Sequence, residues 1–217
     1  MYFLYTDCRD LFFRFTNQDV DMRAPANLKS KDTTLDIVGV AERLYDQIGF
    51  QKTTVADIAR ELSMSPANVY RFYAAKSGIN EAVARKLLTE IEAAINNVVE
   101  QKKSANEKLR AFFEAIEKSH LQRFALNRKL HELLVKAYDE DWQILRPHHQ
   151  VVHNALAEII SQGNREGVFN VGDCAEAATQ VRTACIRFCH PRLIVEFAQD
   201  AKPTLDQMVD LFIRALA

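Results

Sequence analysis

Apolar residues recur every three or four positions along most of the chain, which is the spacing of one face of an α-helix. Only six glycines and five prolines interrupt the 217 residues, and this composition suits long helices. The sequence therefore predicts an all-α fold. The pattern places helices at about 33–48, 55–62, 66–73, 77–100, 104–124, 127–138, 142–166, 173–190 and 204–216, with a short one after Pro191.

Two short helices joined by a tight turn are predicted between Thr53 and Lys76. Thr53 or Thr54 can cap the first of them, whose apolar residues from Val55 onward share one face. Ser65 followed by Pro66 is a strong second start, since a capping hydroxyl precedes a proline at the first helical position. This arrangement predicts a helix-turn-helix, in which the N-terminal end of the second helix enters the major groove of DNA.

The outward face of the second helix carries polar and small residues that suit contact with DNA. Asparagine pairs with adenine through two hydrogen bonds, so base contacts are predicted here. Candidates for base edges or nearby phosphates are Ser65, Ala67 and Asn68, and Arg71 also points outward.

The segment from Thr34 to Arg85 resembles the TetR family of bacterial transcriptional regulators. The resemblance lies in LDIVGVAERLYDQIGF, in TTVADIA, in the turn and in YRFYAAK, which follow one another in order. It implies an all-helical homodimer. A DNA-binding domain at 31–76, with three helices, binds operator DNA, and a larger helical domain at 77–217 binds a small molecule and dimerises.

The resemblance also implies a set of phosphate contacts. Tyr70, Tyr73 and Lys76 lie where the family grips phosphates, and Thr54 can offer its hydroxyl or N–H to another. Phe72 departs from the family pattern, which often has His or Tyr there, and it offers no hydrogen bond. The alternative is that Tyr70 and Tyr73 are ordinary packing residues.

Charge and cysteine content limit the other possibilities. The net charge is −1 and the pI about 6.6, so any basic surface must be local. Residues 29–76 hold seven lysines and arginines against six acidic residues, a balance of +1 that predicts few phosphate contacts. No signal peptide or membrane-length apolar run is found, and the four cysteines show no paired spacing. We expect a cytoplasmic protein with reduced thiols and no membrane association.

Residues 1–30 form an N-terminal extension with two interpretations. The aromatic segment MYFLYTDCRDLFFRF either packs on the body as an extra helix or precedes a true start at Met22. The following polar segment is either a basic DNA-contacting arm, with Arg23, Lys29 and Lys31, or a tail without structure.

An effector pocket is expected among the central helices, with walls that suit an apolar or aromatic ligand. Each of its candidate residues has the alternative of being plain core. The candidates are Phe112, Phe113, Ile116, Trp142, Leu145, His149, Val152 and Phe188.

Two clusters of metal-binding residue types have simpler explanations. His149 and His153 lie one helical turn apart, but no Glu or Cys at a defined spacing supports a metal site. Cys185, Cys189 and His190 form a second set, for which packing of small residues is favoured over metal or redox sensing. No catalytic motif is found, so neither enzymatic activity nor a cofactor is predicted.

The final helices at about 173–190 and 204–216 are the expected dimer interface, because the resemblance implies a four-helix contact with a twin subunit. The leading hypothesis is a repressor that a small molecule releases from a palindromic operator. Two alternatives are a helical ligand-binding protein with a vestigial helix-turn-helix, and a metal or thiol sensor.

Overall fold

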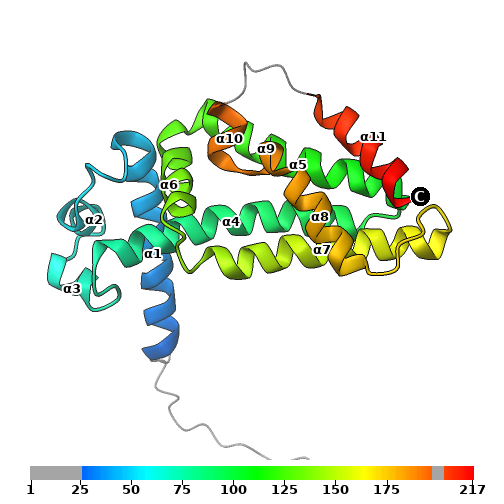
Figure 1. Ribbon diagram of the computed structural model, residues 1–217. Helices are drawn as coiled ribbons and strands as arrows, with labels where there is room; N and C mark the ends of the chain where they lie inside the picture. The colour runs from blue at the N-terminus through cyan, green and yellow to red at the C-terminus, as the bar shows by residue number, and fades with distance from the viewer. Residues whose placement is uncertain (1–25, 197–202) are drawn as a thin grey trace, which may run out of the picture.

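The computed structural model describes residues 26–196 and 203–217, with side chains from residue 32 onward. All regular structure in these residues is helical (Figure 1). The expectations for the aromatic segment, for Met22 and for the side chains of Arg23, Lys29 and Lys31 lie outside the described residues. The helices are α1 (Ala26–Ile48), α2 (Val55–Glu61), α3 (Pro66–Tyr70), α4 (Lys76–Glu100), α5 (Ala105–Leu126), α6 (Arg128–Asp139), α7 (Leu145–Glu166), α8 (Cys174–Ala184), α9 (Ile186–Cys189), α10 (Pro191–Glu196) and α11 (Leu205–Leu216).

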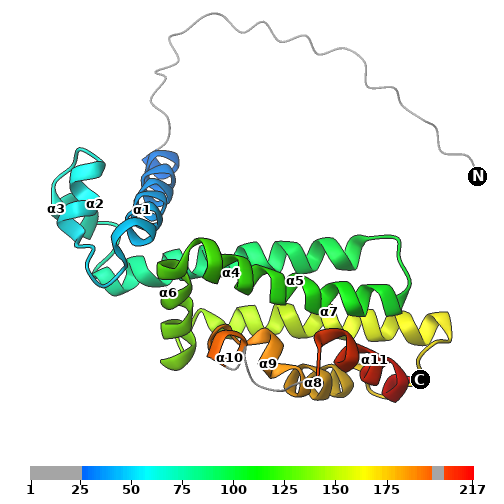
Figure 2. The same cartoon turned by 90° about the horizontal axis from the view of Figure 1, so that it is seen from above.

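The first three helices form a head at one end of the molecule, and the remaining helices form an elongated body (Figures 1 and 2). The long helix α4 belongs to both parts, since it leaves the head and runs along the body beside α5 and α7. Within the body, α8, α9 and α11 pack over α5 and α7.

Two hydrophobic cores divide the molecule, and the division falls within α4. The head core joins α1, α2 and α3 to the first half of α4 and to α6, where Leu133 and Leu134 are fully buried. The body core begins at Ile91 on α4 and continues through α5, α7, α8 and α11. The head therefore rests on helices that also form part of the body.

Local capping explains the helix-turn-helix. Thr54 and Asp57 form a capping box at the start of α2, and the hydroxyl oxygen of Ser65 accepts from the Asn68 N–H at 3.2 Å. Ser63 takes a left-handed conformation with φ 54° and turns the chain between α2 and α3. Gly49 ends α1 with φ 89°, a conformation that glycine adopts without steric cost.

Several helix boundaries differ from the sequence prediction. The first helix begins at Ala26 rather than near Thr33, so Asp32 and Thr33 lie inside the helix. The second helix of the motif ends at Tyr70, three residues before the predicted end. The predicted helix at 173–190 is interrupted at Cys185, where φ −89° and ψ 9° leave helical geometry.

A close approach between α7 and the following loop closes one end of the body. Gly163 leaves room for the Phe169 ring, which is 4% exposed, because a Cβ at Gly163 would lie 1.9 Å from its Cδ2. The Phe169 N–H donates to the Gly163 carbonyl at 3.1 Å. The neighbouring Asn170 N–H donates to the Leu216 carbonyl at 2.8 Å, which holds the end of α11 against this loop.

Candidate nucleic-acid interface and effector cavity

The second helix of the motif, α3, presents one polar face and buries the other. Val69 is fully buried in the head core, whereas Tyr70 is 50% exposed. Since α3 lies at the outer edge of the head, its exposed face is accessible to a DNA duplex (Figure 1). The predicted contact residues Ser65, Ala67, Asn68, Tyr70 and Arg71 are all exposed.

Three further predicted residues, Thr54, Tyr73 and Lys76, border α3, and the structure gives Thr54 and Lys76 a protein partner. Thr54 directs both its N–H and its hydroxyl at Asp57 Oδ2, at 2.9 and 2.7 Å, so both donors predicted for phosphate are engaged. These hydrogen bonds lower the pKa of Asp57. Lys76 Nζ donates to the Gln51 carbonyl at 3.3 Å, and partial burial lowers its pKa although Asp57 opposes the shift. Tyr73 is half-buried, and burial raises its pKa.

Ion pairs occupy acidic side chains of the head. Arg43 pairs with Glu61 at 2.8 Å, and Lys86 of α4 pairs with Glu42. Each pair joins one cation to one anion, so the pairs leave the net charge of the head unchanged. Arg71 stands exposed at the end of α3.

A cavity of about 40 Å³ lies inside the body between α4, α5, α6, α7, α8 and α9. It has room for about three water molecules. Aliphatic side chains alternate with polar ones around it. The lining residues are Ile91, Ile116, His120, Tyr138, His148, His149, Val152, Arg182, Ile186, Cys189 and His190.

Three of the eight residues predicted for an effector pocket, Ile116, His149 and Val152, line this cavity. The other five lie elsewhere, because their helices turn them toward the two cores. Phe112 and Phe113 are fully buried in the body core, and Phe188 packs there too and borders a separate surface depression. Leu145 and Trp142 pack with the head core.

Histidines from distant parts of the sequence converge at the cavity, which the spacing of single residues did not predict. Burial lowers the pKa of His120 to about 3 and that of His149 to about 4, so both are neutral at pH 7. His148 Nδ1 lies 2.9 Å from Glu92 Oε1, and Arg85 also pairs with Glu92. Desolvation of His148 outweighs this carboxylate and lowers its pKa.

Because the folded-state pKa of His120 is depressed, the unfolded chain binds more protons below about pH 6.5, and stability falls as pH falls. Between pH 7 and pH 5 we expect His120 alone to remove about 2 kcal/mol from the free energy of unfolding. Urea titrations at the two pH values measure this loss. Between these pH values, His120→Asn should lose about 2 kcal/mol less free energy of unfolding than the unaltered protein. The control Ser119→Ala should lose as much as the unaltered protein. Equal losses in both variants would contradict the assignment of this pH dependence to His120.

The cysteines are placed for packing. Cys185 lies in the body core, and burial raises the pKa of its thiol to about 12, which disfavours the reactive thiolate. Cys189 packs beside it and its pKa is raised for the same reason. Among the described residues, no three His, Cys, Asp or Glu side chains are arranged to hold a metal ion.

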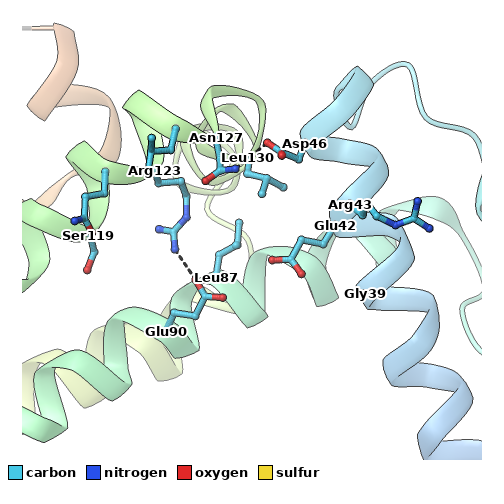
Figure 3. A pocket seen from close by; sticks show the side chains of 12 residues that line it. Gly39, Glu42, Arg43, Asp46, Leu87, Glu90, Ser119, Arg123, Asn127 and Leu130 are labelled. Atoms are coloured by element: carbon cyan, nitrogen blue, oxygen red, sulfur yellow. Dashed lines mark hydrogen bonds and ion pairs between the residues drawn. The ribbon is translucent and has the colours of Figure 1, made fainter.

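A second, open depression of about 610 Å³ lies where the head meets the body (Figure 3). Its walls are largely charged and polar, and they come from α1, α4, α5 and α6. Arg123 pairs with Glu90 across it at 2.8 Å, and Asn127 Nδ2 donates to Asp46 Oδ1 at 3.0 Å. The first contact joins α5 to α4, and the second ties α1 to the body.

A helix-turn-helix head with an exposed recognition helix, joined to a helical body with an internal cavity, defines the class of DNA-binding transcriptional regulators. Family models agree: "Bacterial regulatory proteins, tetR family" matches residues 37–83, and "Tetracyclin repressor-like, C-terminal domain" matches residues 105–209. The chain belongs to the TetR family and is a DNA-binding transcriptional regulator, not an enzyme.

Solved structures share this fold at low sequence identity. A TetR/AcrR regulator from Thermobifida fusca is 16% identical with a TM-score of 0.59, covering 85% of this chain and 96% of its own. A transcriptional regulator from Cytophaga hutchinsonii is 16% identical with a TM-score of 0.63, covering 83% and 96%. RolR, in complex with its ligand resorcinol, is 14% identical with a TM-score of 0.60, covering 88% and 90%. No functionally curated protein matches the chain.

Within residues 26–196 and 203–217, none of the helices has both the length and the apolarity that a membrane span requires.

Proposed function

We propose that the protein is a cytoplasmic, ligand-responsive repressor that a small molecule releases from a palindromic operator. The observation that carries this proposal is that α4 and α6 serve both the cavity and the head. Ile91 of α4 and Tyr138 of α6 line the cavity. On the same α6 helix, Leu133 and Leu134 are buried in the core that supports α1–α3.

This shared support gives a physical route from ligand to DNA. A ligand larger than the cavity must displace its wall, and part of that wall belongs to α6. Lys129 of α6 donates to the Gln47 carbonyl of α1. A shift of α6 would therefore move the head as a rigid unit. Changing the spacing of two heads requires the ligand to prefer the DNA-incompatible conformer by several kcal/mol.

Two subunits are needed to read two half-sites about one DNA turn apart. The proposed interface is formed by the outer faces of α8 and α11. Small and polar residues of α8 such as Thr179 and Thr183 are exposed, and Leu211 of α11 is 49% exposed. Small residues allow a second helix to approach closely.

The cavity walls suit an effector with an apolar or aromatic part. RolR, which has the same fold, binds the aromatic diol resorcinol, and this agrees with a small aromatic effector here. The proposed test is fluorescence anisotropy of the full-length protein with the DNA upstream of its own gene. Binding that is saturable at two subunits per site supports the proposal. Equal affinity for unrelated DNA at roughly 0.15 M salt would favour a vestigial helix-turn-helix.

The double variant Tyr73→Phe with Lys76→Ala tests the phosphate contacts. We expect weaker binding on specific and unrelated DNA alike, and a salt dependence whose slope is smaller by about 1 per subunit, since each lysine–phosphate contact releases a counterion. Anisotropy titrations at several salt concentrations measure the slope. Lys118→Ala, an exposed lysine on α5 in the body, is the control and should leave the slope unchanged. An unaltered slope in the double variant would remove both residues from the interface.

A further inference from the structure

Arg182 of α8 is the one permanently charged residue among the residues that line the body cavity. Its Nε–H is buried, and no described residue accepts a hydrogen bond from it. A buried charge-bearing donor without a partner is costly, so a native structure that keeps one has a reason for it. Here the donor belongs to a residue that lines a cavity.

A second polar atom at the cavity lacks a partner. His120 is 1% exposed, and its Nδ1 forms no hydrogen bond with any described residue. The imidazole is neutral at pH 7 because burial lowers its pKa to about 3. A neutral imidazole can donate or accept, so it complements a ligand without adding charge.

Nearby acidic side chains do not neutralise Arg182. Glu92 is occupied by Arg85 and His148, and Asp139 is paired with Arg192. The charge of Arg182 contributes to lowering the pKa of both His148 and His149, while Glu92 and Asp141 act in the opposite direction. Arg182 is thus the permanent charge that the lining itself offers to a ligand.

Four aliphatic side chains also line the cavity: Ile91, Ile116, Val152 and Ile186. The Tyr138 ring packs edge-on against His149 with centroids 5.7 Å apart. Such walls favour a flat hydrocarbon part beside a single charged group.

We propose that the cavity binds a small aromatic carboxylate, with the carboxylate on Arg182 and the ring against Ile116 and Val152. This inference rests on the proposed function, since it names the chemical class of the effector. The arginine fork matches a carboxylate with two parallel, charge-assisted hydrogen bonds, which are stronger than those to a neutral acceptor. The ring exceeds the cavity of about 40 Å³, so binding displaces the wall that includes Tyr138 of α6.

Isothermal titration of the full-length protein, without DNA, with benzoate, benzamide and benzamidine tests the inference. The three probes have nearly the same shape and carry a charge of −1, 0 and +1. We expect benzoate to bind at least about tenfold more tightly than benzamide, because hydrogen bonds between charged groups are the stronger ones, and benzamidine to bind most weakly.

Arg182→Gln should lower benzoate affinity by about tenfold or more and leave benzamide binding unchanged. Arg182→Lys keeps the charge and should retain the preference for benzoate over benzamidine. Arg146→Gln is the matched control, since it removes the charge of an exposed arginine on α7 that does not line the cavity. Far-UV circular dichroism and melting temperature verify that each variant is folded.

Equal binding of benzoate and benzamide, or loss of preference in Arg146→Gln as well, would overturn the inference. Absence of saturable benzoate binding up to about 10 mM, well above a millimolar dissociation constant, would overturn it too. DNA binding is measured separately by anisotropy. Specific DNA binding without benzoate binding leaves the regulator proposal intact, whereas benzoate binding without specific DNA binding defeats the repressor proposal alone.

Discussion

Asn68→Asp is expected to abolish specific DNA binding while leaving the protein folded. Asn68 is exposed at the third position of α3, where the Ser65 side chain caps the helix. A carboxylate at this position favours the helix N-terminus, as Asp57 does in the capping box of α2. On the predicted DNA-facing side of α3, the same carboxylate would repel phosphates and lack the amide donor predicted to read adenine.

The expected loss is about 1–3 kcal/mol for each recognition helix, or roughly 5–150-fold in affinity per half-site. Anisotropy with the upstream DNA measures it, and thermal unfolding should change by less than about 0.5 kcal/mol. Asn154→Asp is the control, since it makes the same change on an exposed residue of α7. Retained affinity in Asn68→Asp would show that this face of α3 does not meet DNA.

Gly163→Ala is expected to cause the largest loss of stability from a single methyl group. The added Cβ would lie 1.9 to 2.6 Å from three ring atoms of Phe169. The Phe169 ring is buried and cannot move aside easily. The Phe169 backbone is hydrogen-bonded to Gly163, and the backbone of the next residue, Asn170, is hydrogen-bonded to Leu216 at the end of α11. We expect a loss of about 3 kcal/mol, the upper end for overpacked cores, measured by urea denaturation.

Two controls separate this clash from helix propensity. Gly39→Ala makes the same change inside α1, where a Cβ would meet nothing within 4 Å, and should stabilise by about 0.5–1 kcal/mol. Phe169→Ala removes the obstructing ring at a cost of about 3–5 kcal/mol. In that background Gly163→Ala should become neutral or stabilising. A loss that persists without the ring would mean that Gly163 is required for another reason.

The set of polar side chains that meet at the cavity can be recognised only in the folded protein. His120, His148, His149 and His190 lie on three different helices or their ends, so no local spacing predicts that they meet. Arg182 lies in a helix rich in small residues, which the sequence indicates only as a packing surface. Its unpartnered Nε–H is visible only once the neighbouring helices are in place.

The prediction of the effector pocket was limited because a cavity wall, too, is formed by residues from different helices. Large apolar residues at helical spacing mark the inward face of a helix, but they do not distinguish a cavity wall from a filled core. Phe112 and Phe113 face the body core with their ring centroids 5.1 Å apart, while Ile116 one turn later reaches the cavity. Trp142 and Leu145 lie before and at the start of α7, where the chain still packs on the head.

The sequence by itself determined the all-α fold, the helix-turn-helix and the family, because these depend on local signals. The Thr54–Asp57 capping box, the Ser65–Pro66 start and the apolar spacing from Val55 each act within a few residues. The tertiary structure decided where the two cores divide and which side chains line the cavity. Those features depend on residues far apart in the chain, such as Lys129 of α6, which donates to the Gln47 carbonyl of α1, and Asn170, which donates to the Leu216 carbonyl of α11.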